Sequence, residues 1–175
     1  SKLTDEILGR RYTYSPNGFF QINLPVYEMV LREIKQHIKT DNVLDLYAGV
    51  GTIGLSVARD HNLTLVECDK SAYRELENNC HGTSAMPVLA KSEEALEYIQ
   101  PDQTVIIDPP RAGCMPSVIE KIIEQLPVTV IYLSCNPITQ ARDVQTLLEK
   151  YKIKLIAPYN FFPRTPHLEN LIVLE

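Results

Sequence analysis

No run of apolar residues in this sequence approaches the length of a membrane-spanning helix, so we expect no membrane association. No Cys-x-x-Cys pair is present either, and the four cysteines are irregularly spaced: Cys68, Cys80, Cys114 and Cys135. This spacing argues against a metal site, an iron–sulfur cluster or a disulfide framework within the chain, and leaves a thiol free for chemistry. Basic residues are not in excess, and the net charge of −5 counts against nucleic-acid binding through bulk charge.

What the sequence does contain is the composition of a folded domain. The 175 residues are 45% hydrophobic and 22% charged, which is typical of a soluble globular protein of one domain. We expect a cytoplasmic monomer. Residues 1–41 are interpreted as an extension that carries one helix and belongs to the same functional unit as the domain formed by residues 42–175.

From residue 43 onward, short apolar runs alternate with helical patterns. The expected strands are 43–47, 63–67, 87–90, 104–108, 128–134, 152–157 and 169–175, and the expected helices are 52–59, 71–80, 92–99, 116–126 and 137–151. Nearly all-apolar strands that alternate with helices predict a doubly wound, mostly parallel α/β sheet. The last two strands lack a helical crossover, so they predict an antiparallel hairpin at the C-terminus.

The extension before residue 42 has its own helical signals. Asn23 is a suitable N-cap, and Pro25 fits the first turn of a helix. The expected buried stripe of this helix is Val26, Val30, Ile34 and Ile38.

Polar residues follow several of the predicted parallel strands. Ligands of an open α/β sheet bind beyond the carboxyl ends of its strands, so we expect these side chains to lie at a binding edge. They are Asp45, Glu67, Asp108 and Cys135.

A glycine-rich turn follows the first of these strands. Gly49, Gly51 and Gly54 satisfy the G-x-G-x-x-G pattern of a dinucleotide-binding turn, although glycine is also used there for steric reasons alone. Asp45 would repel a pyrophosphate and would suit a ligand with an ammonium and a sulfonium group, whereas Glu67 suits ribose hydroxyls. The pattern therefore favours S-adenosylmethionine over a nicotinamide cofactor.

Several motifs, in order along the chain, carry a resemblance to a known family. They are FFQIN (19–23), DLYAGVGTIGL (45–55), DPPRAG (108–113), LSCNP (133–137) and RTPHLEN (164–170). Together they resemble the catalytic domain of the uracil-5-methyltransferase family, which methylates C5 of uridine in transfer or ribosomal RNA. The resemblance implies a class I methyltransferase fold, which is Rossmann-like, and S-adenosylmethionine as the methyl donor.

The chemistry requires a nucleophile and a base. Uracil C5 is a poor nucleophile until a thiolate adds to C6, and the resemblance assigns that thiolate to Cys135. The position of Cys135 near a helix N-terminus is expected to lower its pKa. Glu169 is the implied acceptor of the C5 proton. The cofactor contacts that the motifs imply are Gln21, Asp45, Tyr47, Gly49, Gly51, Thr52, Glu67 and Asp108.

Two kinds of RNA are compatible with these motifs. The form of DLYAGVG and DPPRAG leans toward 23S ribosomal RNA, with transfer RNA as the alternative. Cytosine-5 methylation fits less well, because Arg111 follows the proline pair where that family has cysteine. A nicotinamide-dependent oxidoreductase and a non-catalytic cofactor-binding module are the remaining alternatives. Family members commonly carry N-terminal RNA-binding segments, which do not appear here, so we expect RNA binding to depend on them.

Overall fold

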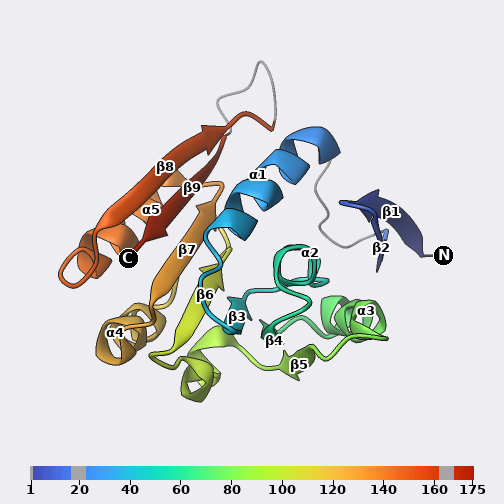
Figure 1. The fold of residues 1–175 in the computed structure, drawn as a ribbon, viewed down its shortest axis with the longest axis horizontal. Coiled ribbons are helices and arrows are strands. Elements are labelled where there is room, and N and C mark those ends of the chain that lie inside the picture. Colours follow the sequence, from blue (N-terminus) through green and yellow to red (C-terminus); the bar gives the residue numbers. More distant parts are fainter. Residues whose placement is uncertain (1, 17–22, 162–167) are drawn as a thin grey trace.

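The computed structural model describes residues 2–16, 23–161 and 168–175, and its centre is a seven-stranded sheet with the order β5-β4-β3-β6-β7-β9-β8 (Figure 1). The strands are β3 (Asn42–Leu46), β4 (Asn62–Glu67), β5 (Met86–Leu89), β6 (Gln103–Ile107), β7 (Thr129–Ser134), β8 (Ile153–Tyr159) and β9 (Glu169–Leu174). Strands β3 to β7 pair in parallel, whereas β9 is antiparallel to both of its neighbours. The predicted doubly wound sheet with a C-terminal antiparallel hairpin is confirmed.

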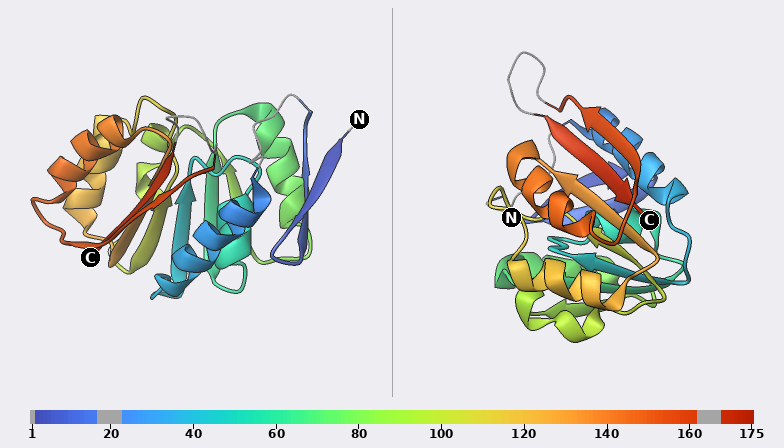
Figure 2. Two further views of the ribbon diagram at one scale, coloured as in Figure 1. Left: turned by 90° about the horizontal axis from the view of Figure 1, so that it is seen from above. Right: turned by 90° about the vertical axis from the view of Figure 1, so that its left-hand side faces the viewer.

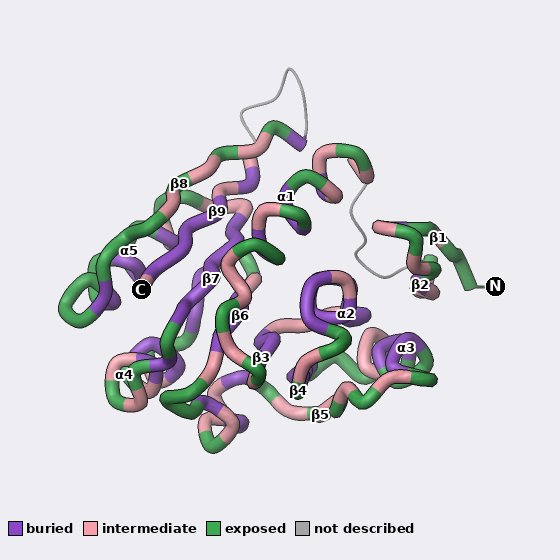
Figure 3. Tube along the Cα trace, viewed as in Figure 1, coloured by how far each residue is buried: buried purple, intermediate pink, exposed green. Residues whose placement is uncertain are grey.

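Helices cover both faces of the sheet (Figure 2). The helices are α1 (Leu24–Gln36), α2 (Thr52–Val57), α3 (Lys70–Cys80), α4 (Pro116–Gln125) and α5 (Pro137–Leu147). Side chains of α1, α2 and α3 share one hydrophobic cluster with one face, and side chains of α4 and α5 share a second cluster with the other. Strands β7 and β9 are buried along almost their whole length between these layers (Figure 3). Within the described ranges, no helix combines the length and the apolar composition that crossing a membrane would need.

The segment expected to form a helix over residues 92–99 instead forms two short 3-10 turns, Ser92–Glu94 and Leu96–Tyr98. Ala95 separates them in a non-helical conformation, and both Ala95 and Ile99 are buried against the sheet. Packing of these two side chains fixes the segment in a tighter path than a regular helix would give.

Helix α1 begins where the sequence predicts. The Asn23 side chain accepts a hydrogen bond from the Val26 amide at 3.4 Å, as an N-cap does. The predicted stripe is confirmed at Val30 and Ile34, whereas Val26 and Ile38 are only partly buried against the same cluster, and four side chains of the helix are buried. These are Tyr27, Val30, Leu31 and Ile34.

A β-hairpin that the sequence analysis did not predict precedes α1. Strands β1 (Leu3–Ile7) and β2 (Arg10–Tyr14) pair antiparallel as a separate two-stranded sheet. Leu8 and Gly9 connect them, both with positive φ (49° and 74°), as a type I′ hairpin turn requires. Gly9 was the one turn signal in the sequence, because leucine is atypical at a turn position with positive φ.

Side-chain hydrogen bonds attach the hairpin to the domain. The Asn79 side chain on α3 exchanges two hydrogen bonds with the Thr13 backbone, at 3.0 and 3.1 Å. It also donates to the carbonyl of Val50 in the glycine-rich turn at 2.9 Å. The hairpin is therefore coupled through one buried amide to the turn that follows β3.

Candidate functional site

The sequence-predicted polar residues gather at one edge of the sheet. The parallel strands β4, β3, β6 and β7 end at this edge, and the antiparallel strand β9 begins there. The order of the strands thus places Glu67, Asp45, Asp108, Cys135 and Glu169 in a line across the sheet. Residues from distant parts of the sequence meet because the fold aligns the ends of their strands.

The turn after β3 contains three residues with positive φ, and its two glycines have different surroundings. Tyr47, Gly49 and Gly51 all have positive φ, at 60°, 57° and 87°. A Cβ added at Gly51 would lie 2.6 Å from a methyl group of Leu76, whereas one added at Gly49 would meet nothing within 4 Å. Gly51 therefore serves the packing of the turn, and the open side of the turn is at Gly49.

Glu67 supports the open side of this turn. One oxygen of its carboxylate accepts a hydrogen bond from the Gly49 amide at 2.7 Å, and the other accepts from the Asp69 amide at 2.6 Å. The carboxylate at the end of β4 thus fixes the conformation of the loop at the end of β3. Thr52, another predicted contact, is the first residue of α2 and is buried.

Asp45 is fully buried beneath α2 rather than exposed at the tip of its strand. Its Oδ2 atom accepts a hydrogen bond from the Gly54 amide at 2.9 Å, while Oδ1 has no hydrogen-bond partner among the described residues. Burial raises the pKa of Asp45 to about 7; the Gly54 hydrogen bond opposes this rise and the negative charge of Glu67 adds to it. A Cβ at Gly54 would lie 2.8 Å from Oδ2, so this close contact requires glycine.

Two more carboxyl groups with raised pKa values continue the line. Burial raises the pKa of Glu169 to about 7. The pKa of Asp108 is raised well above its usual value, first by burial and then by the negative charges of Glu169 and Asp45. No cationic side chain in the described part of the chain lowers either pKa, so these acids share one uncompensated electrostatic environment.

Cys135 is partly exposed at the same edge, directly before the Asn136 cap of α5. Its pKa is raised rather than lowered as the helix position predicted. Burial is the largest cause, and the nearby charges of Glu169 and Asp108 add to it, whereas Arg111 acts in the opposite direction. Desolvation and the two carboxylates therefore outweigh the favourable helix terminus in the unliganded protein.

The first turns of α5 hold the loop that follows β6. The Asn136 side-chain amide and the Thr139 hydroxyl both donate to the carbonyl of Arg111, at 2.9 Å each. The Arg142 guanidinium donates to the carbonyl of Ala112 at 3.0 Å. The DPPRAG segment and the SCNP segment are thus one hydrogen-bonded unit.

A buried acid extends this unit into the interior. Asp143 is 5% exposed, and its Oδ2 accepts hydrogen bonds from the Cys114 amide at 2.8 Å and the Tyr132 hydroxyl at 2.7 Å. Its Oδ1 accepts from Arg142. Both oxygens of this carboxylate are therefore occupied.

Gln140 connects β7 with β9 behind the thiol. Its side-chain amide donates to the carbonyls of Tyr132 and Asn170 at 3.0 and 2.9 Å, and its oxygen accepts from the Asn170 side-chain amide at 2.8 Å. Asn170 directly follows Glu169 in the sequence, and Cys135 directly follows β7. This bridge therefore fixes the spacing between the thiol and the Glu169 carboxyl group.

The structure adds a residue that the sequence analysis missed. Tyr27 on α1 is buried and packs edge-on against Phe161, with ring centroids 6.0 Å apart. Its pKa is raised well above the usual value by burial and then by the charges of Asp108, Asp45 and Glu169. The hydroxyl of Tyr27 thus shares the electrostatic environment of the site. Its helical spacing with the other buried side chains of α1 was the available signal in the sequence.

Not every predicted residue can be placed. Gln21 lies outside the described residues. Among the residues described there is also no group of three His, Cys, Asp or Glu side chains arranged to hold a metal ion.

The carboxylate side chains at this edge fit a ligand that carries positive charge and hydroxyl groups. Asp45, Asp108 and Glu169 have raised pKa values, and a cation placed among them would favour their ionised forms. The open side of the turn at Gly49 lies next to the Glu67 carboxylate, which can accept from hydroxyl groups.

Comparison with known proteins shows what this chain is similar to. The sequence pattern of the tRNA (Uracil-5-)-methyltransferase family matches residues 91–175. A tRNA (uracil(54)-C(5))-methyltransferase of Pyrococcus horikoshii is 34% identical over 169 residues, which cover 96% of this chain and 40% of that protein. An uncharacterised RNA methyltransferase of Mycoplasma mobile is 34% identical over 178 residues, covering 98% of this chain and 49% of the relative.

A solved structure shows the same arrangement. The Pyrococcus abyssi tRNA (uracil-54, C5)-methyltransferase in complex with S-adenosyl-L-homocysteine superposes with a TM-score of 0.92 at 32% identity, over 99% of this chain and 44% of that chain. The chain thus spans about half or less of the length of these relatives. It has a class I methyltransferase fold, and in its motifs and over almost its whole length it is similar to the catalytic domain of the RNA uracil-5-methyltransferase family.

Proposed function

We propose that this chain transfers a methyl group from S-adenosylmethionine to C5 of a uridine in RNA, through a covalent bond between Cys135 and C6. The observation that supports this most directly is the convergence of the partly exposed Cys135 thiol with Glu169 and Asp108 at the carboxyl edge of the sheet. The thiol would be the nucleophile and Glu169 the base.

S-adenosylmethionine would supply an electrophilic methyl group at this edge. Glu67 would accept from its ribose hydroxyls, and Asp45 and Asp108 would favour its positive charge. A nicotinamide cofactor fits less well, because its pyrophosphate would meet this acidic environment. The remaining contacts proposed for the methyl donor are Tyr47, Gly49, Gly51 and Thr52 in the turn and, from the motif resemblance, Gln21.

The protein's own residues would carry two steps. The Cys135 sulfur forms a bond to uracil C6, which places electron density at C5. After C5 is methylated, the Glu169 carboxylate takes the C5 proton, the C6–sulfur bond breaks and the thiolate is released. Arg111 is exposed and its charge opposes the rise in the pKa of Cys135, so it would favour the thiolate and could also bind an RNA phosphate.

For the RNA itself, we favour transfer RNA. The family pattern and two of the relatives carry transfer-RNA descriptions, so the ribosomal-RNA interpretation of the loop motifs has less support. The target uridine would have to leave its base stack to reach Cys135. RNA-binding segments beyond this chain would assist, because the chain covers less than half of these relatives' lengths.

The covalent step can be tested with transfer RNA that contains 5-fluorouridine. Fluorine at C5 cannot leave as a proton, so a stable protein–RNA adduct should form with S-adenosylmethionine and resist denaturing electrophoresis. Cys135→Ala should form none. Cys80→Ala should form as much as the wild type, because Cys80 is buried at the end of α3.

Calorimetry provides a separate test of the cofactor. S-adenosylmethionine and S-adenosylhomocysteine should both bind, and NAD should give no heat of binding. Binding of NAD alone would favour the oxidoreductase alternative. Binding of S-adenosylmethionine without any adduct, in the protein with all of its RNA-binding segments, would favour a non-catalytic module.

A further inference from the structure

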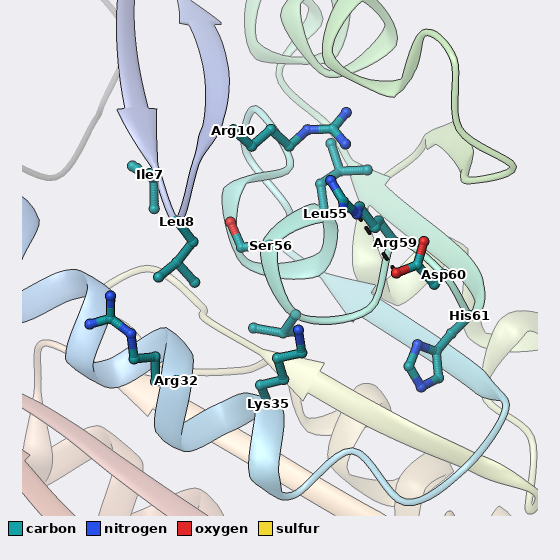
Figure 4. Close-up of a pocket in the computed structure, with 11 residues that line it drawn as sticks. Ile7, Leu8, Arg10, Arg32, Lys35, Leu55, Ser56, Arg59, Asp60 and His61 are labelled. Atoms are coloured by element: carbon teal, nitrogen blue, oxygen red, sulfur yellow. Dashed lines mark ion pairs between the residues drawn. The ribbon is translucent and has the colours of Figure 1, made fainter.

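A second feature lies far from the acidic edge, where the hairpin turn, α1 and the segment after α2 meet. These elements enclose a pocket of about 290 Å³ near the amino ends of β3 and β4 (Figure 4). Strand β4 has six residues and spans about 20 Å, so this pocket and Cys135 lie at opposite ends of the sheet.

The pocket concentrates positive charge on an acidic protein. Asp60 is the one acidic residue among the described side chains that line it, against four cationic ones: Arg10, Arg32, Lys35 and Arg59. The chain as a whole has a net charge of −5, so this concentration is local and does not reflect overall composition. A concave site with clustered cations favours an anionic ligand.

Two of the four cations are held by the protein itself. Arg10 donates a hydrogen bond to the carbonyl of Asn79. Arg59 pairs with Asp60 at 3.7 Å. The Arg10 contact holds one positive charge on the β2 side of the pocket, whereas the charge of Arg59, which is 55% exposed, is partly compensated by Asp60.

The other two cations lie on α1. Lys35 is exposed and has no ion-pair partner within the described part of the chain. Arg32 pairs with Glu28 at 3.2 Å, and 60% of its side chain is exposed. Both extend from α1 toward the hairpin turn and α2, across the pocket (Figure 4).

A further polar group in the pocket is unpartnered. Nδ1 of His61 is buried and has no hydrogen-bond partner among the residues described. A buried polar atom without a partner is rare, but this one is shielded from solvent, so the His61 ring lies beside the pocket and does not contact a ligand there through Nδ1. Leu8, Leu55 and Val57 supply an apolar wall beside these polar groups.

We propose that this pocket binds a phosphate group, and that the phosphate belongs to the RNA substrate. The first part rests on the pocket alone, and the second rests on the proposed function. The carboxylates at the catalytic edge repel RNA phosphates, so phosphate contacts besides the one proposed for Arg111 are expected on other surfaces. A folded RNA is large enough to reach both ends of the sheet.

The test compares two charge-matched double variants of the protein. Arg32→Gln with Lys35→Gln removes the pocket's cations on α1, and Lys70→Gln with Arg74→Gln removes two exposed cations from α3. Fluorescence anisotropy with labelled transfer RNA should show about tenfold weaker binding and a smaller salt dependence for the pocket variant only. Calorimetry with S-adenosylmethionine should give the wild-type affinity for both variants.

A second measurement separates the sources of the phosphate. Inorganic phosphate should shift the ring NMR signals of His61 saturably in the wild type and not in the pocket variant. A phosphate-induced shift with unchanged RNA binding would overturn the RNA assignment and leave a site for a small phosphate. Absence of a shift would overturn the phosphate site, whatever the RNA affinity. If both pocket effects appear but no adduct forms with 5-fluorouridine RNA, the proposed function fails and the anion site stands.

Discussion

The carboxyl edge of the sheet consists of two halves, one formed by β3, β4 and α2 and the other by β6, β7, α5 and β9. In the first half, the buried Asp45 has one oxygen without a partner among the described residues, and positive φ angles recur in the following turn. In the second half, the buried Asp143 and Gln140 have every side-chain oxygen in a hydrogen bond. We call the first half incomplete because a buried acid oxygen lacks a partner there, and the second complete because its buried network is satisfied, although Asp108 and Glu169 at its surface have raised pKa values.

The two halves of the edge therefore perform two different physical tasks. A group that must respond to a ligand is destabilised while the ligand is away, since its charge is desolvated and unpaired. A nucleophile and a base must instead keep a fixed spacing, and a satisfied buried network supplies the rigidity. The comparison predicts opposite effects on stability for substitutions in the two halves.

The largest expected effect is catalytic and concerns Glu169. Glu169→Gln should slow methylation by about 10²- to 10⁴-fold, because glutamine cannot accept the C5 proton. Since elimination needs that step, the variant should accumulate the Cys135–RNA adduct with ordinary uridine RNA, visible on denaturing gels. Cys135→Ala, the control, should be equally slow but free of adduct.

The pH dependence of the methylation rate tests the same assignment of Glu169 as the base. Burial raises the pKa of Glu169 to about 7, so the wild-type rate should rise as the pH increases through 7 and the carboxyl group ionises. The residual rate of the glutamine variant should lack this rise. A profile that is unchanged by the substitution would assign the base to another residue.

The next largest effect should come from the complete half. Asp143→Ala should lower the free energy of unfolding by about 3 kcal/mol, because the Tyr132 hydroxyl and the Cys114 amide would stay buried without an acceptor. Urea denaturation measures this loss. Asp102→Ala, which removes an exposed acid that accepts from Asn42, should change stability by less than about 1 kcal/mol. Equal losses in the two variants would mean that the network adds no stability.

The sequence predicted the fold correctly where its pattern of apolar residues follows the periodicity of the secondary structure. Apolar runs and glycine turns located the strands of the large sheet, and aligned strand ends brought Asp45, Asp108 and Cys135 to one edge. The direction of the Cys135 pKa shift was wrong, because it depends on Glu169 and on burial, neither of which is visible from neighbours in the chain. Tyr27 was missed for a similar reason: its burial depends on how α1 rotates against the sheet.

The smallest expected effect concerns the incomplete half and has the opposite sign. The pKa of Asp45 is about 7 in the folded protein, compared with an ordinary value of 3.8. The unfolded chain therefore loses this proton first, and the wild type loses stability as the pH rises from about 4 to 7, by at most about 4 kcal/mol. Above pH 7 the loss is constant.

Asp45→Asn removes this titration while it keeps an oxygen that can accept from the Gly54 amide. Its new NH₂ group would occupy the position of the unpartnered Oδ1, which costs about 1 to 3 kcal/mol at every pH. The variant should thus be less stable than the wild type at pH 4.5 and more stable by about 1 to 3 kcal/mol at pH 8, as measured by urea denaturation.

The same variant also tests what the incomplete half is for. Its affinity for S-adenosylmethionine, measured by calorimetry, should fall, because the negative charge that favours a cationic ligand is gone. Stability gained at pH 8 together with affinity lost would mean that the buried charge of Asp45 is tolerated in the free protein for the sake of the ligand. A stability difference that stays the same at both pH values would show that Asp45 carries no electrostatic penalty. The contrast between the two halves would then come from backbone strain at Tyr47 in the turn after β3, since its positive φ angle does not depend on pH.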